Sequence, residues 1–224
     1  MTTLTKICGL STADALDAAL AEHADFVGFV FFPPSPRNVP LDLARDLGTL
    51  VQGRAHKVAL TVDADDAFHA AIVEAIKPDA LQLHGQETAE RVVALKERFG
   101  LPVIKAMPVG TRDDLGAVAA YAGVADWLLF DARAPKDATR PGGHGNTFDW
   151  TLLKNLDPRL RFMLSGGLGP GNVGQALAMT GAPAVDVSSG VEVRPGVKDP
   201  SKIADFIRAV RAADAARVGA ASSV

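Results

Sequence analysis

Short apolar runs alternate with longer stretches of helical periodicity along almost the whole chain. The apolar runs have the length and the β-branched or aromatic content of buried strands. They predict eight strands, at Leu4–Cys8, Phe26–Phe31, Lys57–Val62, Ala80–His84, Val103–Met107, Trp127–Asp131, Arg161–Ser165 and Ala184–Ser188. Stretches with apolar residues three and four apart follow these strands and predict helices, at Thr12–Glu22, Leu41–Leu50, Asp65–Ile76, Ala89–Phe99, Arg112–Tyr121, Trp150–Leu156, Pro170–Met179 and Lys198–Ala213.

This alternation predicts a parallel sheet, because parallel strands need a crossover connection and no Asn-Gly hairpin turn separates the runs. An open, doubly wound sheet is the alternative. Such a sheet usually has five or six strands, and one that binds a nucleotide carries Gly-x-Gly-x-x-Gly after its first strand. Here the first strand ends in Cys-Gly-Leu-Ser. We therefore predict an α/β protein with a single (β/α)₈ TIM barrel over residues 1–213, followed by an Ala-, Ser- and Gly-rich tail, 214–224, that frays.

Length and charge narrow the class of protein. The 224 residues suit one compact barrel. A net charge of −3 argues against nucleic acid or an anionic membrane as the main partner. Neither a signal peptide nor a run of about 18 apolar residues is visible. The lone Cys8 cannot form an internal disulfide, which suits a reducing compartment. We expect a cytoplasmic protein with a small-molecule substrate, either a monomer or a homodimer.

The ends of the last two predicted strands are rich in glycine and serine. In such barrels the active site lies at the C-terminal ends of the strands, and the loops after strands seven and eight often bind phosphate. Glycine lets backbone N–H groups approach an anion closely. Either loop alone is as readily explained as a tight turn, but the pair favours phosphate binding. The candidate phosphate-binding residues are Ser165, Gly166, Gly167, Ser188, Ser189 and Gly190.

Three further strand-end or loop residues are candidates for chemistry. Asp131 closes an apolar strand, where poor solvation suits a general acid, although a loop-capping role is the alternative. Cys8 closes the first strand and suits a base or nucleophile, although a lone cysteine is more often a small buried apolar residue. Arg37, on the proline-stiffened loop Phe32–Pro40, suits a carboxylate, with a solvated surface arginine as the alternative.

Two other polar residues share a strand face with a neighbour two positions away. His84 lies on the face of Gln82 and is expected to line the mouth of the barrel, and Asp186 lies on the face of Ser188, where it would orient a sugar hydroxyl. The histidines show no metal-ligand spacing, and no cofactor fingerprint occurs. We expect neither a metal nor a cofactor.

Taken in order, several segments resemble the phosphoribosylanthranilate isomerase family of tryptophan biosynthesis. Each is weakly specific alone, but the ordered set spans nearly the whole chain. At the third strand the chain departs from the family's Gly-Val-Phe-Val-like pattern, with Val-Ala-Leu-Thr-Val-Asp at 58–63. The matching segments are 6–10 (Lys-Ile-Cys-Gly-Leu), 26–31 with Ser35-Pro36-Arg37, 81–85 (Leu-Gln-Leu-His-Gly), 128–131 (Leu-Leu-Phe-Asp), 142–150, 164–168 (Leu-Ser-Gly-Gly-Leu) and 185–192.

The resemblance implies an aldose-ketose isomerase that performs the Amadori rearrangement of N-(5-phosphoribosyl)anthranilate. Asp131 would protonate the ribose ring oxygen, and Cys8, as a thiolate, would then remove the C2 proton of the ring-opened iminium. Arg37 would hold the anthranilate carboxylate. The two glycine loops, helped by Gly142, Gly143 and Gly145, would hold the phosphate.

The ordinary pKa values, about 3.9 for Asp and 8.5 for Cys, are the reverse of what an Asp acid and a Cys base require. The site must therefore tune at least one of them. Lys6 lies two residues before Cys8, on the same strand face, so we expect its ammonium to lower the pKa of the thiol.

Two alternatives belong to other functional classes. One is a different phosphate-binding barrel enzyme, such as indole-glycerol-phosphate synthase or a sugar-phosphate isomerase or epimerase, but the strand-end lysine and glutamate set or the metal-binding histidines these need are not seen. The other is a non-catalytic ligand-binding barrel. The presence of Cys8, Arg37 and Asp131 together argues against it.

Overall fold

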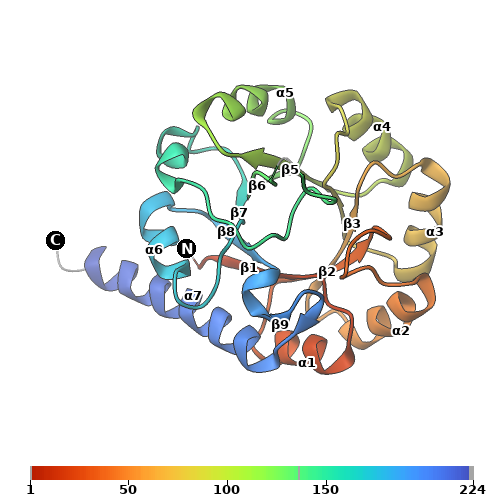
Figure 1. The fold of residues 1–224 in the computed structure, drawn as a ribbon, viewed down its shortest axis with the longest axis horizontal. Coiled ribbons are helices and arrows are strands. Elements are labelled where there is room, and N and C mark those ends of the chain that lie inside the picture. Colours follow the sequence, from red (N-terminus) through yellow and green to blue (C-terminus); the bar gives the residue numbers. More distant parts are fainter. Residues whose placement is uncertain (1, 136, 222–224) are drawn as a thin grey trace.

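The strands close into a barrel in the computed structural model, which describes residues 2–135 and 137–221 (Figure 1). Within these residues eight parallel strands lie side by side in sequence order, and the last pairs with the first. Every predicted strand is present, with bounds within two residues of those expected, so the (β/α)₈ TIM barrel is confirmed. The strands are β1 (Leu4–Cys8), β2 (Phe26–Phe31), β3 (His56–Thr61), β4 (Ala80–Leu83), β5 (Val103–Val109), β6 (Trp127–Ala132), β7 (Phe162–Leu164) and β8 (Ala184–Val187).

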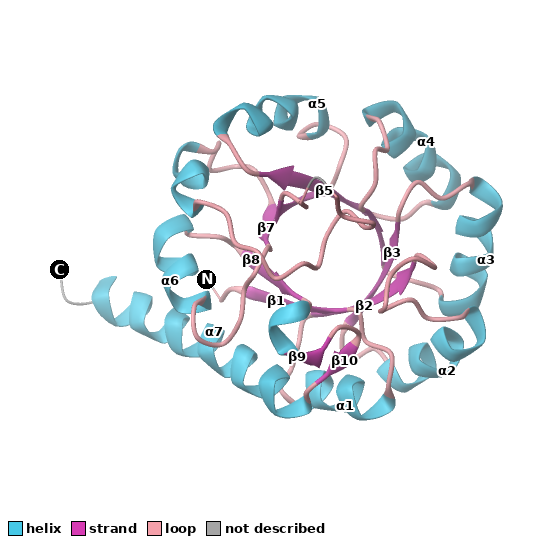
Figure 2. Ribbon diagram, in the orientation of Figure 1, coloured by secondary structure: helices cyan, strands magenta, loops and turns pink. Residues whose placement is uncertain are grey.

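Helices surround the barrel on its outside (Figure 2). Three of them begin at a side chain that accepts a first-turn N–H: Thr12, Asp65 and Thr88. No helix in the described part of the chain is long and apolar enough to cross a membrane. The helices are α1 (Ala13–Ala21), α2 (Leu41–Val51), α3 (Asp66–Ile76), α4 (Ala89–Phe99), α5 (Val118–Tyr121), α6 (Val173–Thr180) and α7 (Pro200–Ala221).

The fifth and sixth connections are tighter than the predicted helices. The segment predicted as one helix over Arg112–Tyr121 is a 3₁₀ helix, Arg112–Ala117, followed by the single turn of α5. The Asp114 carboxylate accepts the N–H groups of Gly110 and Thr111, at 2.8 and 2.9 Å, which holds the first turn tight. The sixth connection is the 3₁₀ helix η2, Trp150–Asn155.

A short hairpin that no sequence pattern indicates lies between β8 and α7. It follows the 3₁₀ turn η3 (Ser189–Val191) and consists of β9 (Glu192–Arg194) and β10 (Val197–Lys198). Gly196 makes its turn possible, because φ is +83° there and an added Cβ would lie 2.3 Å from the carbonyl oxygen of Pro36. The hairpin thereby packs against the loop that carries Arg37.

The last helix extends beyond Ala213, where the sequence predicts its end and the start of a tail. Helix α7 runs through this point to Ala221. Asp214 is buried, and its carboxylate accepts hydrogen bonds from the N–H and hydroxyl of Thr3, both at 2.7 Å. The start of β1 and the end of the chain are therefore tied together. Residues 222–224 of the expected tail lie outside the described residues.

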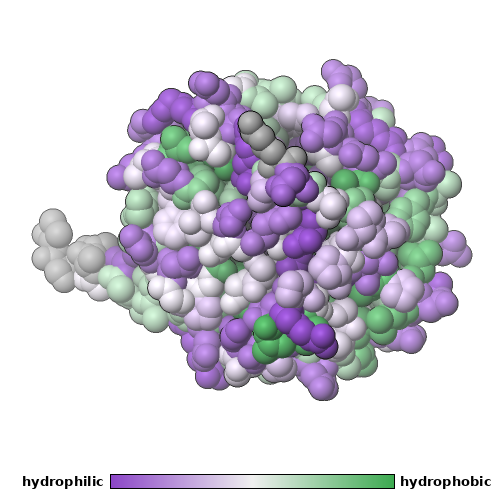
Figure 3. Space-filling model, in the orientation of Figure 1, coloured by the Kyte–Doolittle hydropathy of each residue, from purple (hydrophilic) through white to green (hydrophobic). Residues whose placement is uncertain are grey.

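The core has an apolar layer between strands and helices and a separate filling inside the barrel. The inside is apolar toward the N-terminal ends of the strands, where Val58, Ile104, Leu129 and Met163 pack together. Toward the C-terminal ends it becomes polar. That end faces the reader in Figure 3, where hydrophilic residues gather around the centre. The barrel thus combines a packed floor with a polar mouth, as such barrels do.

Candidate active site

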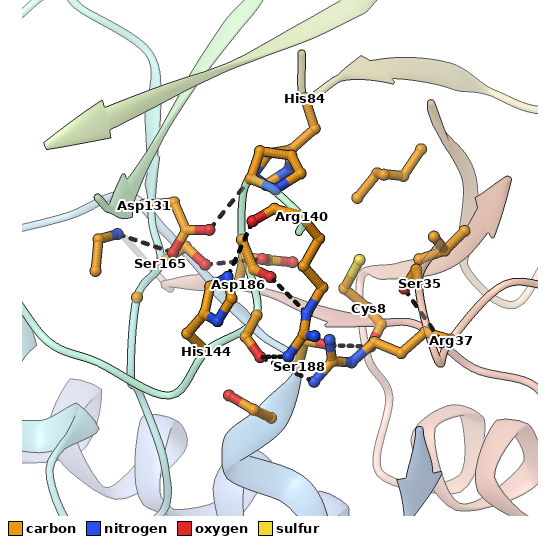
Figure 4. Close-up of a pocket in the computed structure, with 18 of the residues that line it drawn as sticks. Cys8, Ser35, Arg37, His84, Asp131, Arg140, His144, Ser165, Asp186 and Ser188 are labelled. Carbon is orange, nitrogen blue, oxygen red and sulfur yellow. Dashed lines mark hydrogen bonds and ion pairs between the residues drawn. The ribbon is translucent and has the colours of Figure 1, made fainter. Parts of the chain in front are cut away.

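A pocket of about 760 Å³, including the open space at its mouth, lies where the C-terminal ends of the strands meet (Figure 4). Strand ends from most of the barrel and the loop 132–148 form its walls. The structure brings together all the residues expected at the site except Gly190, which does not line the pocket. Those that do are Cys8, Arg37, His84, Asp131, Gly142, Gly143, Gly145, Ser165, Gly166, Gly167, Asp186, Ser188 and Ser189.

Cys8 lies at the end of β1 beside a buried ion pair. The Nζ atom of Lys6, whose side chain is fully buried, donates to Asp186 Oδ1 at 2.7 Å. Asp186 Oδ2 accepts a hydrogen bond from Ser165 Oγ at 3.0 Å. The inner face of β2 leaves room for this pair at Gly28, where an added Cβ would lie 3.0 Å from Cys8 Sγ and 3.2 Å from Lys6 Nζ.

These surroundings act on the pKa values of both groups. Burial lowers the pKa of Lys6, but the neighbouring Asp186 carboxylate and Cys8 raise it above its ordinary value, so Lys6 is a buried ammonium. Burial raises the pKa of the Cys8 thiol, and the opposing effect of Lys6 is smaller. The expectation that Lys6 brings the thiol pKa below its ordinary value is therefore wrong, because desolvation outweighs the ammonium.

Asp131 lies at the C-terminal end of β6 and faces His84, which directly follows β4. Its Oδ1 accepts the N–H of Ala132 at 2.9 Å, and its Oδ2 lies 3.4 Å from His84 Nε2. The Gln82 amide nitrogen lies 3.1 Å from His84 Nδ1. A donating Gln82 amide leaves the ring proton on Nε2, facing Asp131. Gly142 covers this pair, since an added Cβ there would lie 2.6 Å from Asp131 Oδ2.

Arg37 is buried in a network that the sequence analysis did not foresee. Its guanidinium donates to both carboxylate oxygens of Glu192, from Nε at 2.7 Å and from Nη2 at 2.9 Å. Nη2 also donates to the Gly143 carbonyl at 3.1 Å. Lys198 Nζ donates to Glu192 Oε1 at 2.8 Å and to the Ser188 carbonyl at 2.8 Å. The Nε and Nη2 atoms of Arg37 are thus bonded to Glu192 of the β9–β10 hairpin. Its Nη1 donates no hydrogen bond within the described residues.

The glycine loops after β7 and β8 have the open backbone expected of an anion cradle. Gly166 and Gly167 have φ values of +84° and +61°, and in the described part of the chain neither N–H donates a hydrogen bond. Ser189 Oγ lies near Gly145, 3.7 Å from an added Cβ. Gly190 instead lies against the carbonyl of Leu168, where an added Cβ would be 1.8 Å away, so close packing explains this glycine.

One wall of the pocket is apolar, and the sequence analysis missed it. Val30 and Phe32 on β2 and its loop, and Leu60 and Val62 on β3 and its loop, line the pocket beside Cys8. The period-two spacing within each pair places both residues on one face and could have predicted this wall. Asp63 lies in the third-strand segment 58–63, where the sequence departs from the family pattern. Its carboxylate accepts the N–H of Gln86 at 2.6 Å, so the loop after β3 is bonded to the loop after β4.

An arginine and a histidine of the loop 132–148 also line the pocket, and no sequence pattern predicts either of them. They are Arg140 and His144, and Figure 4 shows both pointing toward its centre. No spacing rule places a side chain on so long a loop. Among the described residues no group of three or more His, Cys, Asp or Glu side chains is placed to hold a metal ion.

Comparison with known proteins gives a consistent result. Residues 5–209 match the family described as N-(5'phosphoribosyl)anthranilate (PRA) isomerase. An N-(5'-phosphoribosyl)anthranilate isomerase of Rhodopseudomonas palustris (strain BisB5) is 64% identical over 214 residues, which is 96% of this chain and 98% of the relative. One from Nitrobacter winogradskyi is 58% identical over 224 residues, the full length of both chains.

Solved structures agree with the sequence relatives. The crystal structure of phosphoribosyl anthranilate isomerase from Thermotoga maritima superposes with a TM-score of 0.85 at 34% identity, covering 94% of this chain and 100% of that one. A phosphoribosyl anthranilate isomerase in complex with reduced 1-(o-carboxyphenylamino)-1-deoxyribulose 5-phosphate superposes with a TM-score of 0.82 at 32% identity, with the same coverage.

Proposed function

Because the chain belongs to the N-(5'-phosphoribosyl)anthranilate isomerase family, we propose that its pocket performs the Amadori rearrangement with Cys8 as base and Asp131 as acid. The chain is an aldose-ketose isomerase of tryptophan biosynthesis. It converts N-(5-phosphoribosyl)anthranilate into 1-(2-carboxyphenylamino)-1-deoxyribulose 5-phosphate.

The first step is ring opening at Asp131. The protonated carboxyl group donates its proton to the ribose ring oxygen, the C1–O bond breaks, and the nitrogen lone pair forms the iminium. Asp131 suits this role because it stands at the mouth, while its backbone is fixed at the end of β6. His84 Nε2, 3.4 Å away, steadies the carboxylate that remains.

The second step is proton removal from C2 by Cys8. The electrons of the C2–H bond form a C1=C2 double bond, and those of the C=N bond return to nitrogen. Uptake of a proton at C1 and loss of the 2-hydroxyl proton then give the ketone. Burial disfavours the thiolate in the pocket, but a cationic iminium beside Sγ favours it. Ring opening therefore places a positive charge beside Sγ that favours the thiolate, and the thiolate is the form of Cys8 that removes the C2 proton and becomes the thiol.

The residues that line the pocket suggest where the anthranilate group, the phosphate and the sugar hydroxyls bind. The apolar wall of Val30, Phe32, Leu60 and Val62 suits the aromatic ring, and Arg37, next along the same loop, suits its carboxylate. The phosphate is proposed to lie against Ser165–Gly167, Ser188–Ser189 and Gly145, while Gly190 packs behind them against Leu168. Gly142 and Gly143, also expected at the phosphate, lie beside Asp131 and Arg37. Asp186 and His84 are proposed to face the sugar hydroxyls.

The observation that carries this assignment is the placement of Cys8 and Asp131 on opposite walls of one pocket, at the ends of β1 and β6. Purified protein should consume N-(5-phosphoribosyl)anthranilate in a fluorescence assay of the anthranilate group. Binding of a product analogue without turnover would instead indicate the non-catalytic ligand-binding barrel.

The wider setting of the protein is also a proposal. A net charge of −3 and a single, free and buried cysteine fit a cytoplasmic enzyme that acts on a small phosphorylated molecule and not on nucleic acid or a membrane. We propose a monomer or a homodimer. A structural relative from Thermotoga maritima is described as monomers of a dimeric isomerase. Sedimentation at several concentrations distinguishes the two states.

A further inference from the structure

Two guanidinium groups converge on one backbone carbonyl at the edge of the pocket. Arg37 Nη2 donates to the oxygen of Gly143 at 3.1 Å, and Arg140 Nη2 donates to the same oxygen at 3.4 Å. Arg140 Nε donates to the neighbouring carbonyl of Gly142 at 3.2 Å. Both bonds of Arg140 are longer than the 2.7–2.9 Å typical of a guanidinium on a carboxylate. In Figure 4 the two guanidinium groups lie side by side, with Arg140 coming from above and Arg37 from the right.

The charges at this point do not balance. Glu192 is the one carboxylate paired with either guanidinium in the part of the chain that the structure describes, and it also takes a hydrogen bond from Lys198. Arginine cannot lose its charge in a protein. Two adjacent permanent cations, facing a pocket and sharing only a neutral carbonyl, make a site for an anionic ligand group.

We propose that Arg140 is a second ligand of the anthranilate carboxylate, which this chain grips between Arg140 and Arg37. The proposal rests on the isomerase function above and adds a substrate-binding residue to it. A carboxylate has two oxygens, so it can accept from one guanidinium on each side, and it is a stronger acceptor than the glycine carbonyls that Arg140 contacts.

The position of Arg140 along its loop favours the carboxylate over the phosphate. The loop reaches Arg37 at Gly143, where an added Cβ would lie 2.3 Å from Arg37 Nη1. It reaches the phosphate loops further along, where Gly145 lies near Ser189 and where an added Cβ on Gly167 would lie 2.7 Å from the carbonyl of Asn146. Arg140 bonds to the first part of the loop only.

Binding of the substrate carboxylate by Arg140 should also affect Asp131, the proposed general acid. Gly142, whose carbonyl contacts Arg140, lies directly over Asp131 and His84. A substrate that holds Arg140 therefore holds the loop over the group that protonates the ring oxygen. This coupling predicts that loss of Arg140 raises KM and also lowers kcat.

The test measures Kd for two ligands by calorimetry. One is reduced 1-(o-carboxyphenylamino)-1-deoxyribulose 5-phosphate, and the other is the same compound without its carboxyl group. Arg140→Gln should weaken binding of the first about ten- to hundredfold, the range expected for one charge-assisted hydrogen bond. Binding of the second should change less than about twofold. Arg140→Lys, which keeps the charge and loses the fork, should fall between.

Arg133→Gln is the matched control, because Arg133 starts the same loop, is exposed and pairs with Asp114 outside the pocket. It should bind both ligands as wild type does. Equal losses for both ligands in Arg140→Gln would overturn the proposal and assign Arg140 to the phosphate or to loop structure. No loss for either would also overturn it. Failure of wild type to turn over substrate would refute the isomerase assignment itself, which is a separate outcome.

Discussion

The two walls that carry the proposed acid and base hold them in different ways. On the base side, Cys8 is 3% exposed and lies beside the Lys6–Asp186 pair, whose 2.7 Å bond is made inside the barrel. On the acid side, Asp131 and His84 lie 3.4 Å apart and are closer to solvent, with about a tenth of each side chain exposed. Cys8 is thus surrounded by residues of the barrel strands, whereas Asp131 is covered by the loop 132–148.

This difference separates two ways of tuning a catalytic group. Every neighbour that acts on Cys8 comes from a barrel strand or from the hairpin that follows β8, so its surroundings are rigid and its reactivity is set by burial and fixed charge. Asp131 depends on Gly142 and the rest of the loop 132–148 for exclusion of water. Mutations around Cys8 should therefore act on the reaction through burial and fixed charge, whereas mutations in the loop over Asp131 should also change the exclusion of water from the acid.

The largest effect is expected for Cys8→Ser on the base side. A serine hydroxyl ionises far less readily than a thiol, so the variant lacks the anion that would remove the C2 proton. We expect kcat to fall by about 10⁴, the upper end of the range for one acid–base group. The small change should leave ligand binding and the melting temperature near wild type. Nearly full activity in the serine variant would show that Cys8 is a structural cysteine.

Asp131→Asn should cost less, about 10² to 10³ in kcat with KM little changed. The amide keeps the size and shape of the side chain but cannot donate an acidic proton. His84 Nε2 is close enough to supply part of the lost function. Steady-state kinetics of Asp131→Asn and of Asp131→Asn/His84→Gln test this, since the double variant should lose more. Wild-type turnover in Asp131→Asn would sink its assignment as the acid.

The same contrast explains which parts of the fold and the site can be predicted from the sequence. Cys8 and Asp131 were found because each closes an apolar run, and the end of a strand in a barrel is a defined place. The strand bounds followed from the same runs. The 3₁₀ segments were missed because local bonds such as those of Asp114 outweigh helical periodicity. The last helix is longer than predicted, because composition does not reveal the bond from Thr3 to Asp214.

Contacts between distant segments were beyond sequence reasoning. The pairing of Arg37 with Glu192 joins residues 155 positions apart, and Glu192 lies on a hairpin that no pattern indicated. Arg140 lies on a loop, where no periodicity fixes the direction of a side chain. The direction of the Cys8 pKa shift has a related reason: the sequence shows that Lys6 is near, but not how completely the thiol is buried.

Arg37→Ala should show a smaller effect, mainly on binding. Loss of a charge-assisted contact with the substrate carboxylate should raise KM about ten- to hundredfold. It also leaves Glu192 with Lys198 as its remaining cation. Removing the carboxyl group from the ligand should weaken binding to wild type much more than binding to the variant. Equal discrimination by both proteins would mean that Arg37 serves the fold through Glu192 and not the substrate.

The smallest effect, and the sharpest test of the base side, concerns Lys6. Because burial raises the pKa of Cys8, its alkylation by iodoacetamide should be slow near pH 7 and should accelerate as the pH rises, since only the thiolate reacts. Lys6→Gln removes the ammonium that opposes burial. The rise in alkylation rate, and the acidic limb of kcat/KM, should both move to higher pH.

Lys105→Gln provides the matched control for that shift. Lys105 is also a buried lysine with a carboxylate partner, Glu87, 2.9 Å away, but it faces outward from β5 and does not line the pocket. Its loss should lower the melting temperature, as should loss of Lys6, because each leaves a buried carboxylate unpaired. Only Lys6→Gln should shift the pH dependence of Cys8. Equal shifts in both variants would show that general destabilisation exposes the thiol, and the fixed charge of the base side would then have no part in tuning it.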